Sequence, residues 1–370
     1  MSEKKERFNS FDTIKFLVVF LGCTIGHFWQ FTPKSYDAVC ETAAMSKIID
    51  VLTHFTFLHT HSFMELLFMV SGFQMYVAYH KRLSEGQLSF EEYFKKRIKR
   101  LYPPMIISTI VMSIGLLVYK HYMLSDWCGA PFIPRAFVMS MLGIQAWNSD
   151  IHVLNGPLWF LSVLLLCIIV YYWIERIGAR FKLSEFALFI PIVFALSHFY
   201  DQSVFIWLHN DVCRGLFGFF LGAVFAAAYR NIDKKKLTVC SVVCILAYLP
   251  LFFGFYEECM IDPTDRATIT SLLVYGPVLL LLALYPKADA VVGVKPLSFM
   301  GKTSFHLYCL NFPFYIWMMI FNIRLGLNIN YESFWIFWLF VILQLALSVA
   351  LYYLIDKDGW KINKDKRTKQ

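Results

Sequence analysis

The sequence predicts an all-α, polytopic membrane protein with about ten transmembrane helices and both termini in the cytoplasm. Hydrophobic residues make up 58% of the 370 residues and charged residues only 16%, whereas soluble domains are about 45–50% apolar. Apolar runs of roughly 20 residues, the length that crosses a bilayer, recur along the chain. Basic clusters separate alternate runs, which is the pattern of cytoplasmic connections.

The apolar runs define the expected helices in order. They cover residues 13–31, 60–80, 104–124, 157–174, 185–200, 212–229, 238–255, 267–285, 303–321 and 333–355. We interpret the first run as a retained helix, because no small-residue cleavage site follows it. The chain is expected to form one integral membrane domain over 1–370, in which cytoplasmic tails (1–12 and 356–370) flank a helix bundle (13–355).

Two features near the third run refine this division. The segment RAFVMSMLGIQAW (135–147) is apolar but only about 13 residues long, so we expect an interfacial or re-entrant piece and not a span. Pro103 and Pro104 are expected to open the third span, because a proline in the first turn of a helix removes no hydrogen bond.

Charge and cysteine usage exclude other classes. A net charge of +8 could indicate a nucleic-acid partner, but the positive charge lies in clusters between apolar runs, so we expect a lipid bilayer and no nucleic acid. The nine cysteines form no CxxC pair. His54, His59 and His61 match no zinc template, so we expect aromatic-rich packing there and no metal.

Ionisable residues inside apolar runs usually face a cavity or a partner. Asp12 and Lys15 lie at the predicted cytoplasmic mouth, where a lysine can also snorkel to the interface. His27 lies near the outer end of the same run, where an interfacial histidine is also ordinary. Glu65 enters the second run and requires a donor or a water-filled cavity. Lys15 and His27 are separated by about 18 Å of helical rise and by about 120° around a regular helix.

Two arginines mark the connection after the second run. Arg97 and Arg100 in FEEYFKKRIKRLYPP are three residues apart and share one helical face. The positive-inside rule accounts for basic residues here. Arginine, however, also offers a planar fork that suits phosphate, so a phosphate-bearing cytosolic ligand is the second interpretation.

Four stretches together resemble the acyltransferase-3 family of integral membrane acyltransferases. FDTIKFLVVFLGCTIGH is similar to the Asp, Arg and His pattern of the family's first helix. ELLFMVSGFQM, followed by FKKRIKRLYP, resembles its SGF segment and arginine-bearing loop. The stretch NGPLWFLSVLLL resembles the branch of the family that has a Trp-Phe-Leu-Ser sequence. The stretch MGKTSFHLYCLNFP resembles the family's late Gly-Lys-x-Ser segment. The stretch RGLFGFFLGA, which begins with Arg214, resembles a family helix that begins with arginine and is rich in Phe and Gly. The resemblance covers nearly the whole chain.

The resemblance implies transfer of an acyl group, usually acetyl, from cytoplasmic acyl-CoA to a hydroxyl of a surface or lipid-linked glycan, in a bacterial cytoplasmic membrane. His27 would be the catalytic histidine, and Lys15 takes the place of the first-helix arginine. The expected catalytic residues are His27, Lys15, Asp12 and Glu65. The expected donor-binding residues are Arg97, Arg100, Tyr102 and Ser71, and the expected acceptor-binding residues are Trp159, Arg214, Tyr308 and Asn311.

The chain departs from the family pattern at three places. Lys15 keeps the charge of an arginine but loses its fork. His27 follows Lys15 by twelve positions, where the family more often has a spacing of eleven. A π-bulge would absorb the extra residue, and Gly22 and Gly26 would ease it. Asn311 stands where the family often has a histidine. It can hydrogen-bond but cannot exchange protons near neutral pH, so we expect it to hold a ligand or the fold.

Acyl transfer to an alcohol requires a base for the hydroxyl proton. His27 would act as that base or carry the acyl group itself, and Glu65 or Asp12 would orient its ring as carboxylates do in triads. The rival classes are a glycan or lipid-linked sugar transporter or flippase, and a non-catalytic acyl-CoA or lipid sensor. The acceptor glycan, the acyl chain and the oligomeric state stay open.

Overall fold

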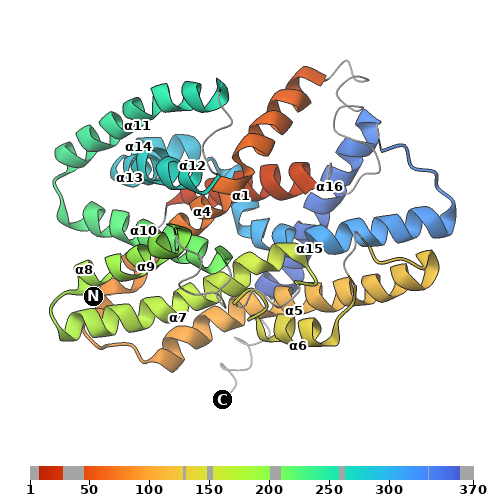
Figure 1. The fold of residues 1–370 in the computed structure, drawn as a ribbon, viewed down its shortest axis with the longest axis horizontal. Helices are drawn as coiled ribbons and strands as arrows, with labels where there is room; N and C mark the ends of the chain where they lie inside the picture. Colours follow the sequence, from red (N-terminus) through yellow and green to blue (C-terminus); the bar gives the residue numbers. More distant parts are fainter. Residues whose placement is uncertain are drawn as a thin grey trace.

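The computed structural model describes residues 8–27, 46–127, 131–147, 153–200, 210–257, 263–331 and 333–358. Every element in these ranges is helical (Figure 1), which confirms the all-α class. In chain order the elements are α1 (Asn9–Val19), η1 (Phe20–Ile25), α4 (Ser46–Ser84), α5 (Phe90–Met123), α6 (Pro134–Leu142), η2 (Gly156–Leu158), α7 (Trp159–Arg180), α8 (Ser184–Ala187), α9 (Phe189–Tyr200), α10 (Asn210–Asn231), α11 (Lys234–Glu257), α12 (Pro263–Thr270), η3 (Ser271–Tyr275), α13 (Gly276–Leu284), α14 (Pro286–Val292), α15 (Lys295–Leu325), α16 (Phe334–Leu351) and η4 (Tyr352–Asp358).

Each of the ten predicted runs falls at least in part on helical residues. Within the described ranges, five helical stretches are long and apolar enough to cross a membrane: Phe90–Met123, Gly156–Arg180, Asn210–Asn231, Ala267–Leu284 and Trp335–Ile355. The architecture is thus that of a multi-pass membrane protein, while the count of ten spans and their orientation stay predictions. Helices α1, α4 and α15 are not among the five, and they carry many of the polar residues of the candidate site.

The region around the third span confirms one expectation and corrects another. Helix α6 has nine residues, too few to cross a core of about 30 Å. The expectation for Pro103 and Pro104 is wrong, because α5 begins at Phe90 and continues through both. Ser89 caps this helix by accepting a hydrogen bond from the Glu92 amide at 3.3 Å. The helix therefore starts well before its apolar part.

Glycines let pairs of helices approach closely at the centre of the bundle. A Cβ added to Gly222 of α10 would lie 2.0 Å from the Met69 carbonyl oxygen of α4. A Cβ on Gly301 of α15 would lie 2.0 Å from the Asp12 carbonyl oxygen of α1. Backbones can come this near only without a side chain between them, as in tightly packed membrane helices. Helix α1 is thus fixed against α15 and lies in the middle of the bundle (Figure 1).

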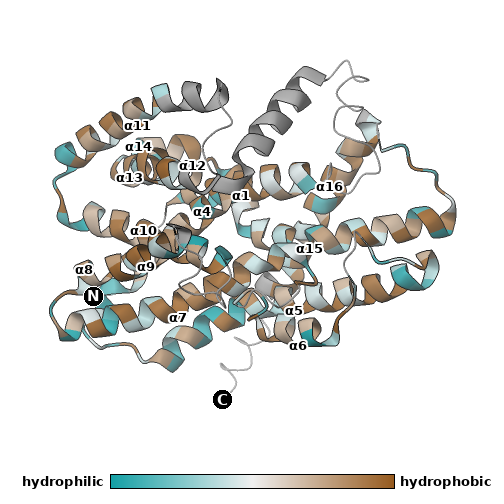
Figure 2. Ribbon diagram, viewed as in Figure 1, coloured by the Kyte–Doolittle hydropathy of each residue, from teal (hydrophilic) through white to brown (hydrophobic). Residues whose placement is uncertain are grey.

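The outward faces of several helices are apolar. Val239, Val243 and Leu246 of α11 are 63%, 57% and 57% exposed, and Trp335 of α16 is 77% exposed. Figure 2 shows hydrophobic colours along the helices and hydrophilic colours at turns such as that between α10 and α11. Exposed apolar surface on this scale fits contact with lipid.

Candidate active site

The first helix contains the distortion that its sequence predicts. Helix α1 changes at Phe20 into the π-helical segment η1, which ends at Ile25 and includes Gly22. A π-turn takes up one residue more than an α-turn. The twelve-residue interval between Lys15 and His27 therefore behaves as eleven, which leaves the two about 20° apart around the axis. The predicted π-bulge is confirmed.

Asn311 of α15 holds the imidazole of His27. His27 Nδ1 lies 2.5 Å from Asn311 Oδ1. The other end of the same amide, Nδ2, donates to the Cys23 carbonyl oxygen at 3.2 Å and to Gln344 Oε1 at 3.1 Å. Cys23 lies within η1 and Gln344 on α16. One buried side chain thus joins the histidine, the π-turn and the last long helix.

The partners of the Asn311 amide determine which imidazole nitrogen of His27 carries the hydrogen. The Cys23 carbonyl can only accept a hydrogen bond, so the amide nitrogen of Asn311 faces it and the amide oxygen faces His27. Because that oxygen can only accept, His27 Nδ1 must carry a hydrogen. In the neutral ring Nε2 is then the nitrogen that can take a proton. The predicted role of Asn311, to hold a ligand or the fold, becomes specific: it orients His27.

A loop and an aromatic ring complete the surroundings of His27. Phe312 lies edge-on to the imidazole, with 5.0 Å between ring centroids. Gly156 sits against that phenylalanine, because a Cβ there would lie 2.4 Å from its ring. The loop is fastened to α15 from both sides: Asn155 Nδ2 donates to the Cys309 carbonyl at 3.0 Å, and the Tyr308 hydroxyl donates to the Pro157 carbonyl. The segment that begins NGPLW therefore borders the site.

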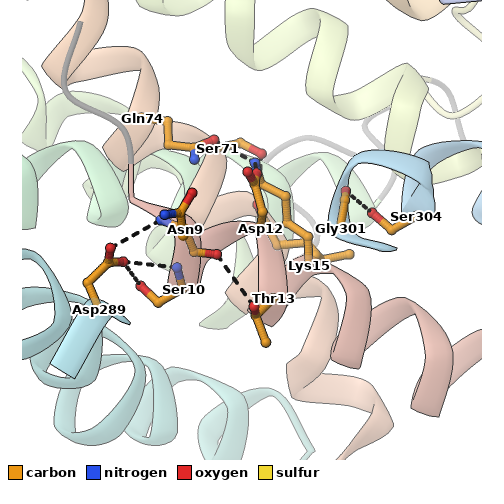
Figure 3. Close-up of polar contacts among 11 residues, drawn as sticks. Asn9, Ser10, Asp12, Thr13, Lys15, Ser71, Gln74, Asp289, Gly301 and Ser304 are labelled. Carbon is orange, nitrogen blue, oxygen red and sulfur yellow. Dashed lines mark hydrogen bonds and ion pairs between the residues drawn. The ribbon is translucent and has the colours of Figure 1, made fainter. Parts of the chain in front are cut away.

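Lys15 and Asp12 lie at the other end of α1 (Figure 3). Lys15 Nζ donates to Gln74 Oε1 at 2.7 Å and lies 3.5 Å from Asp12 Oδ1. Ser71, one turn before Gln74 on α4, donates from Oγ to the Leu67 carbonyl at 2.8 Å. His27 follows Asp12 by fifteen positions, about 22 Å of helical rise. The expectation that Asp12 orients the imidazole is therefore wrong.

Glu65 also has a different partner from the one expected. Its Oε1 accepts from Arg214 Nε at 2.6 Å, and Arg214 Nη1 donates to Asp211 Oδ1 at 3.2 Å. Glu65 is only 3% exposed, and among the described residues its Oε2 has no hydrogen-bond partner. Arg214 Cζ lies 5.2 Å from the centre of the Trp159 ring. Glu65 therefore anchors an arginine beside a tryptophan instead of orienting His27.

Three of the four predicted donor-binding residues, Arg97, Arg100 and Tyr102, lie along α5, and Ser71 lies on α4. The guanidinium of Arg97, which is partly buried, lies 4.6 Å above the Tyr79 ring, and Arg100 is exposed. Two nearby tyrosines are already engaged. The Tyr93 hydroxyl donates to the Ile168 carbonyl at 3.1 Å, and the Tyr102 hydroxyl to the Leu142 carbonyl at 2.5 Å. Tyr102 thus fastens α6 to α5, and the ring next to Arg97 is that of Tyr79.

One residue at this end was not anticipated. Asp289 of α14 caps the start of α1 (Figure 3): its Oδ1 accepts from the Ser10 amide at 2.9 Å and from the Ser10 hydroxyl at 2.5 Å, and its Oδ2 accepts from the Asn9 amide at 3.3 Å. A carboxylate there satisfies open amides and complements the helix dipole. Sequence spacing gives no sign of a cap supplied from 279 residues away. The side chains of His54, His59 and His61, weighed above for metal binding, lie outside the described part of the structure.

Comparison with known proteins identifies the family. The acyltransferase 3 model, described as an acyltransferase domain, matches residues 8–353. The comparisons with curated proteins and with solved structures found no match. The matched range runs from the residue before α1 into η4, which follows α16, and includes every site residue described above. The chain therefore belongs to the acyltransferase 3 family of membrane acyltransferases.

Proposed function

We propose that the protein is an O-acetyltransferase of a bacterial cytoplasmic membrane. It moves an acetyl group from cytoplasmic acetyl-CoA, or a related acyl group from its CoA ester, to a hydroxyl of a surface or lipid-linked glycan. Family membership supports acyl transfer as the reaction. The observation that carries the proposal is the hydrogen bond from His27 Nδ1 to Asn311 Oδ1, because it prepares the opposite nitrogen for proton transfer.

In the proposed reaction His27 acts as the base. Nε2 takes the proton of the acceptor hydroxyl while that oxygen attacks the thioester carbonyl. The carbon–sulfur bond then breaks, and the CoA thiolate leaves with the proton from the imidazolium. In the alternative route Nε2 first accepts the acyl group and then passes it to the hydroxyl. Both routes use the same nitrogen, so Asn311 supports either.

The donor is proposed to enter from the cytoplasmic end of α5. Arg97 and Arg100 would hold the phosphates of CoA, since arginine forks match phosphate oxygens. Lys15, held by Gln74 and Asp12, gives the first helix a positive charge between this mouth and His27. Because Lys15 lies about 18 Å of helical rise from His27, we assign it to guiding the donor and not to the reacting atoms. Ser71 belongs to the same donor side.

The acceptor is proposed to contact Trp159 and Arg214. An aromatic face beside a charged group offers both an apolar surface and hydrogen-bond donors, the combination that binding sites use to orient a ligand. Glu65 would keep Arg214 in place. Tyr308 and Asn311 have an indirect part in this proposal, because their polar atoms already hold the loop and His27.

The test is turnover by the full chain in membrane vesicles. Vesicles that contain the protein and the cell's own glycans receive acetyl-CoA labelled in the acetyl group, and both free CoA thiol and labelled glycan are measured. We expect the two to appear together. Movement of saccharide across the vesicle membrane without CoA release would instead identify a transporter or flippase. Binding of acetyl-CoA without turnover would identify a sensor.

A further inference from the structure

Gln344 is a buried polar residue on an otherwise apolar helix. It is 3% exposed, whereas Trp335 and Ile342 on the same helix are 77% and 59% exposed. A buried amide costs free energy unless it is hydrogen-bonded. Asn311 Nδ2 donates to Gln344 Oε1 at 3.1 Å, and the Gln344 amide also interacts with the side chain of Tyr315. The residue therefore faces the site from the side of α16.

The position of Gln344 determines how the Asn311 amide can lie. The amide has two orientations of nearly the same shape. The Cys23 carbonyl requires its nitrogen, and Gln344 Oε1 accepts from the same nitrogen. With both acceptors present, the oxygen must face His27. In the reverse orientation the amide nitrogen would face Nδ1, which would then have to accept. The hydrogen of the neutral ring would move to Nε2, and Nε2 could not take a proton.

We propose that Gln344 is a positioning residue that sets the reactive tautomer of His27 through the Asn311 amide. Its amide oxygen Oε1 accepts from Asn311, the residue that touches the histidine. The inference rests on the proposed function of His27. Its effect is limited, because the Cys23 carbonyl still favours the same orientation when Gln344 is lost. One hydrogen bond of this kind corresponds to about a two- to thirteen-fold change in an equilibrium.

The test compares substitutions on α16 in the full chain, in the vesicles described above. Gln344→Leu should lower kcat by about two- to thirteen-fold and leave the KM for acetyl-CoA unchanged, because the donor site is elsewhere. Gln344→Glu should recover most of the rate, since a carboxyl oxygen also accepts from Asn311. Ser348→Ala is the matched control: Ser348 is buried one turn away, and its hydroxyl donates within its own helix, to the Leu345 carbonyl at 2.8 Å.

A double substitution separates positioning from general damage. If Gln344 acts through Asn311, adding Gln344→Leu to Asn311→Ala should cause no further loss, because the amide to be oriented is gone. Equal losses in both backgrounds would overturn the inference. If Gln344→Leu inserts poorly, Gln344→Met, which keeps the side-chain length but removes the amide, tests the same expectation.

The outcomes also distinguish this inference from the proposed function. If His27→Ala turns over like the wild type, the proposed function fails and the role of Gln344 fails with it. If His27→Ala is inactive while Gln344→Leu turns over like Ser348→Ala, only the role of Gln344 is overturned. A loss in Gln344→Leu that Gln344→Glu does not recover would also overturn it.

Discussion

His27 and Asn311 lie 284 positions apart in the sequence, and their side chains meet with 2.5 Å between Nδ1 and Oδ1. The contact joins the end of the first helix to the middle of α15. The Asn311 amide oxygen, which does not titrate, thus lies against the His27 imidazole, which does. The amide therefore fixes which nitrogen carries the hydrogen without competing for the proton. That division of roles leads to the first prediction.

His27→Ala should lower acetyl transfer by about 10²–10⁴-fold, the range for loss of a general base, while the protein still inserts and folds. His121→Ala is the matched control, because His121 is an exposed histidine near the end of α5. The measurement is label transfer at equal amounts of inserted protein. If the His27 variant kept more than about a tenth of the wild-type rate, the base or nucleophile would lie elsewhere.

Arg97→Ala and Arg100→Ala should each weaken acetyl-CoA binding roughly ten- to a hundred-fold, because a hydrogen bond to a charged group contributes about 1.5–3 kcal/mol. Lysine at either position should recover only part of the affinity, since it lacks the fork. Lys99→Ala is the control: it removes an exposed positive charge from the same stretch of α5. Titration of CoA into purified variants measures the effect.

The competing view of these arginines is that they only set topology. Under that view both alanine variants would insert poorly, and the inserted fraction would bind CoA with unchanged affinity. Dephospho-CoA adds a second comparison. If one arginine holds the 3′-phosphate, its alanine variant should bind CoA and dephospho-CoA almost equally, whereas the wild type should prefer CoA.

Breaking the ion pair between Glu65 and Arg214 should destabilise the fold strongly. Loss of one partner of a buried pair costs about 3–5 kcal/mol, because the other charge stays buried. Glu65→Gln should therefore lower the midpoint of thermal unfolding in detergent more than Asp211→Asn does. Asp211 is the more exposed of the two carboxylates that pair with Arg214. Equal midpoints would show that the two carboxylates contribute alike.

Asp289→Ala should destabilise the start of α1 by about 1 kcal/mol, the usual cost of losing a helix cap. Because α1 carries both Lys15 and His27, this variant should also transfer acetyl more slowly. Asp233→Ala is the control. Asp233 Oδ1 accepts from the Lys235 amide at 3.0 Å, so this variant removes a similar cap from the start of α11. If both variants slow transfer to the same degree, the cap on α1 has no special part in the reaction.

The predicted orientation can be checked with introduced cysteines and a reagent that does not cross membranes. Cysteine at Glu85 or Lys234 should be unreactive in intact cells, and cysteine at Ser125 should be labelled; all three positions are exposed. The neighbouring Gly86 is unsuitable, because its φ is 76° and an added Cβ would lie 2.7 Å from Arg176 Nη1. Labelling at Glu85 from outside would reverse the predicted orientation.

The sequence predicted the class and the distortion but not the partners. The helical runs follow from hydrophobic length. The π-turn follows from comparing the Lys15–His27 spacing with the family pattern, which is one residue shorter. An apolar run around Glu65 indicates that this carboxylate needs a donor, yet nothing local identifies Arg214, which lies 149 positions away. Asn311 was recognised as unable to exchange protons, but its contact with His27 depends on how α15 packs against α1. Short-range patterns carry no information about such pairs.

The π-turn between Phe20 and Ile25 has a consequence for aligning this chain with relatives in which the histidine follows the charged residue by eleven positions instead of twelve. The extra residue belongs inside that turn, so the gap in a shorter relative should open there. Placed before Phe20, the gap would shift the helical phase of residues that still keep a regular α-helical register. Placed after Ile25, it would misalign the segment that leads into His27. Deleting one residue within the turn should accordingly yield a plain α-helix that still presents Lys15 and the histidine on the same side.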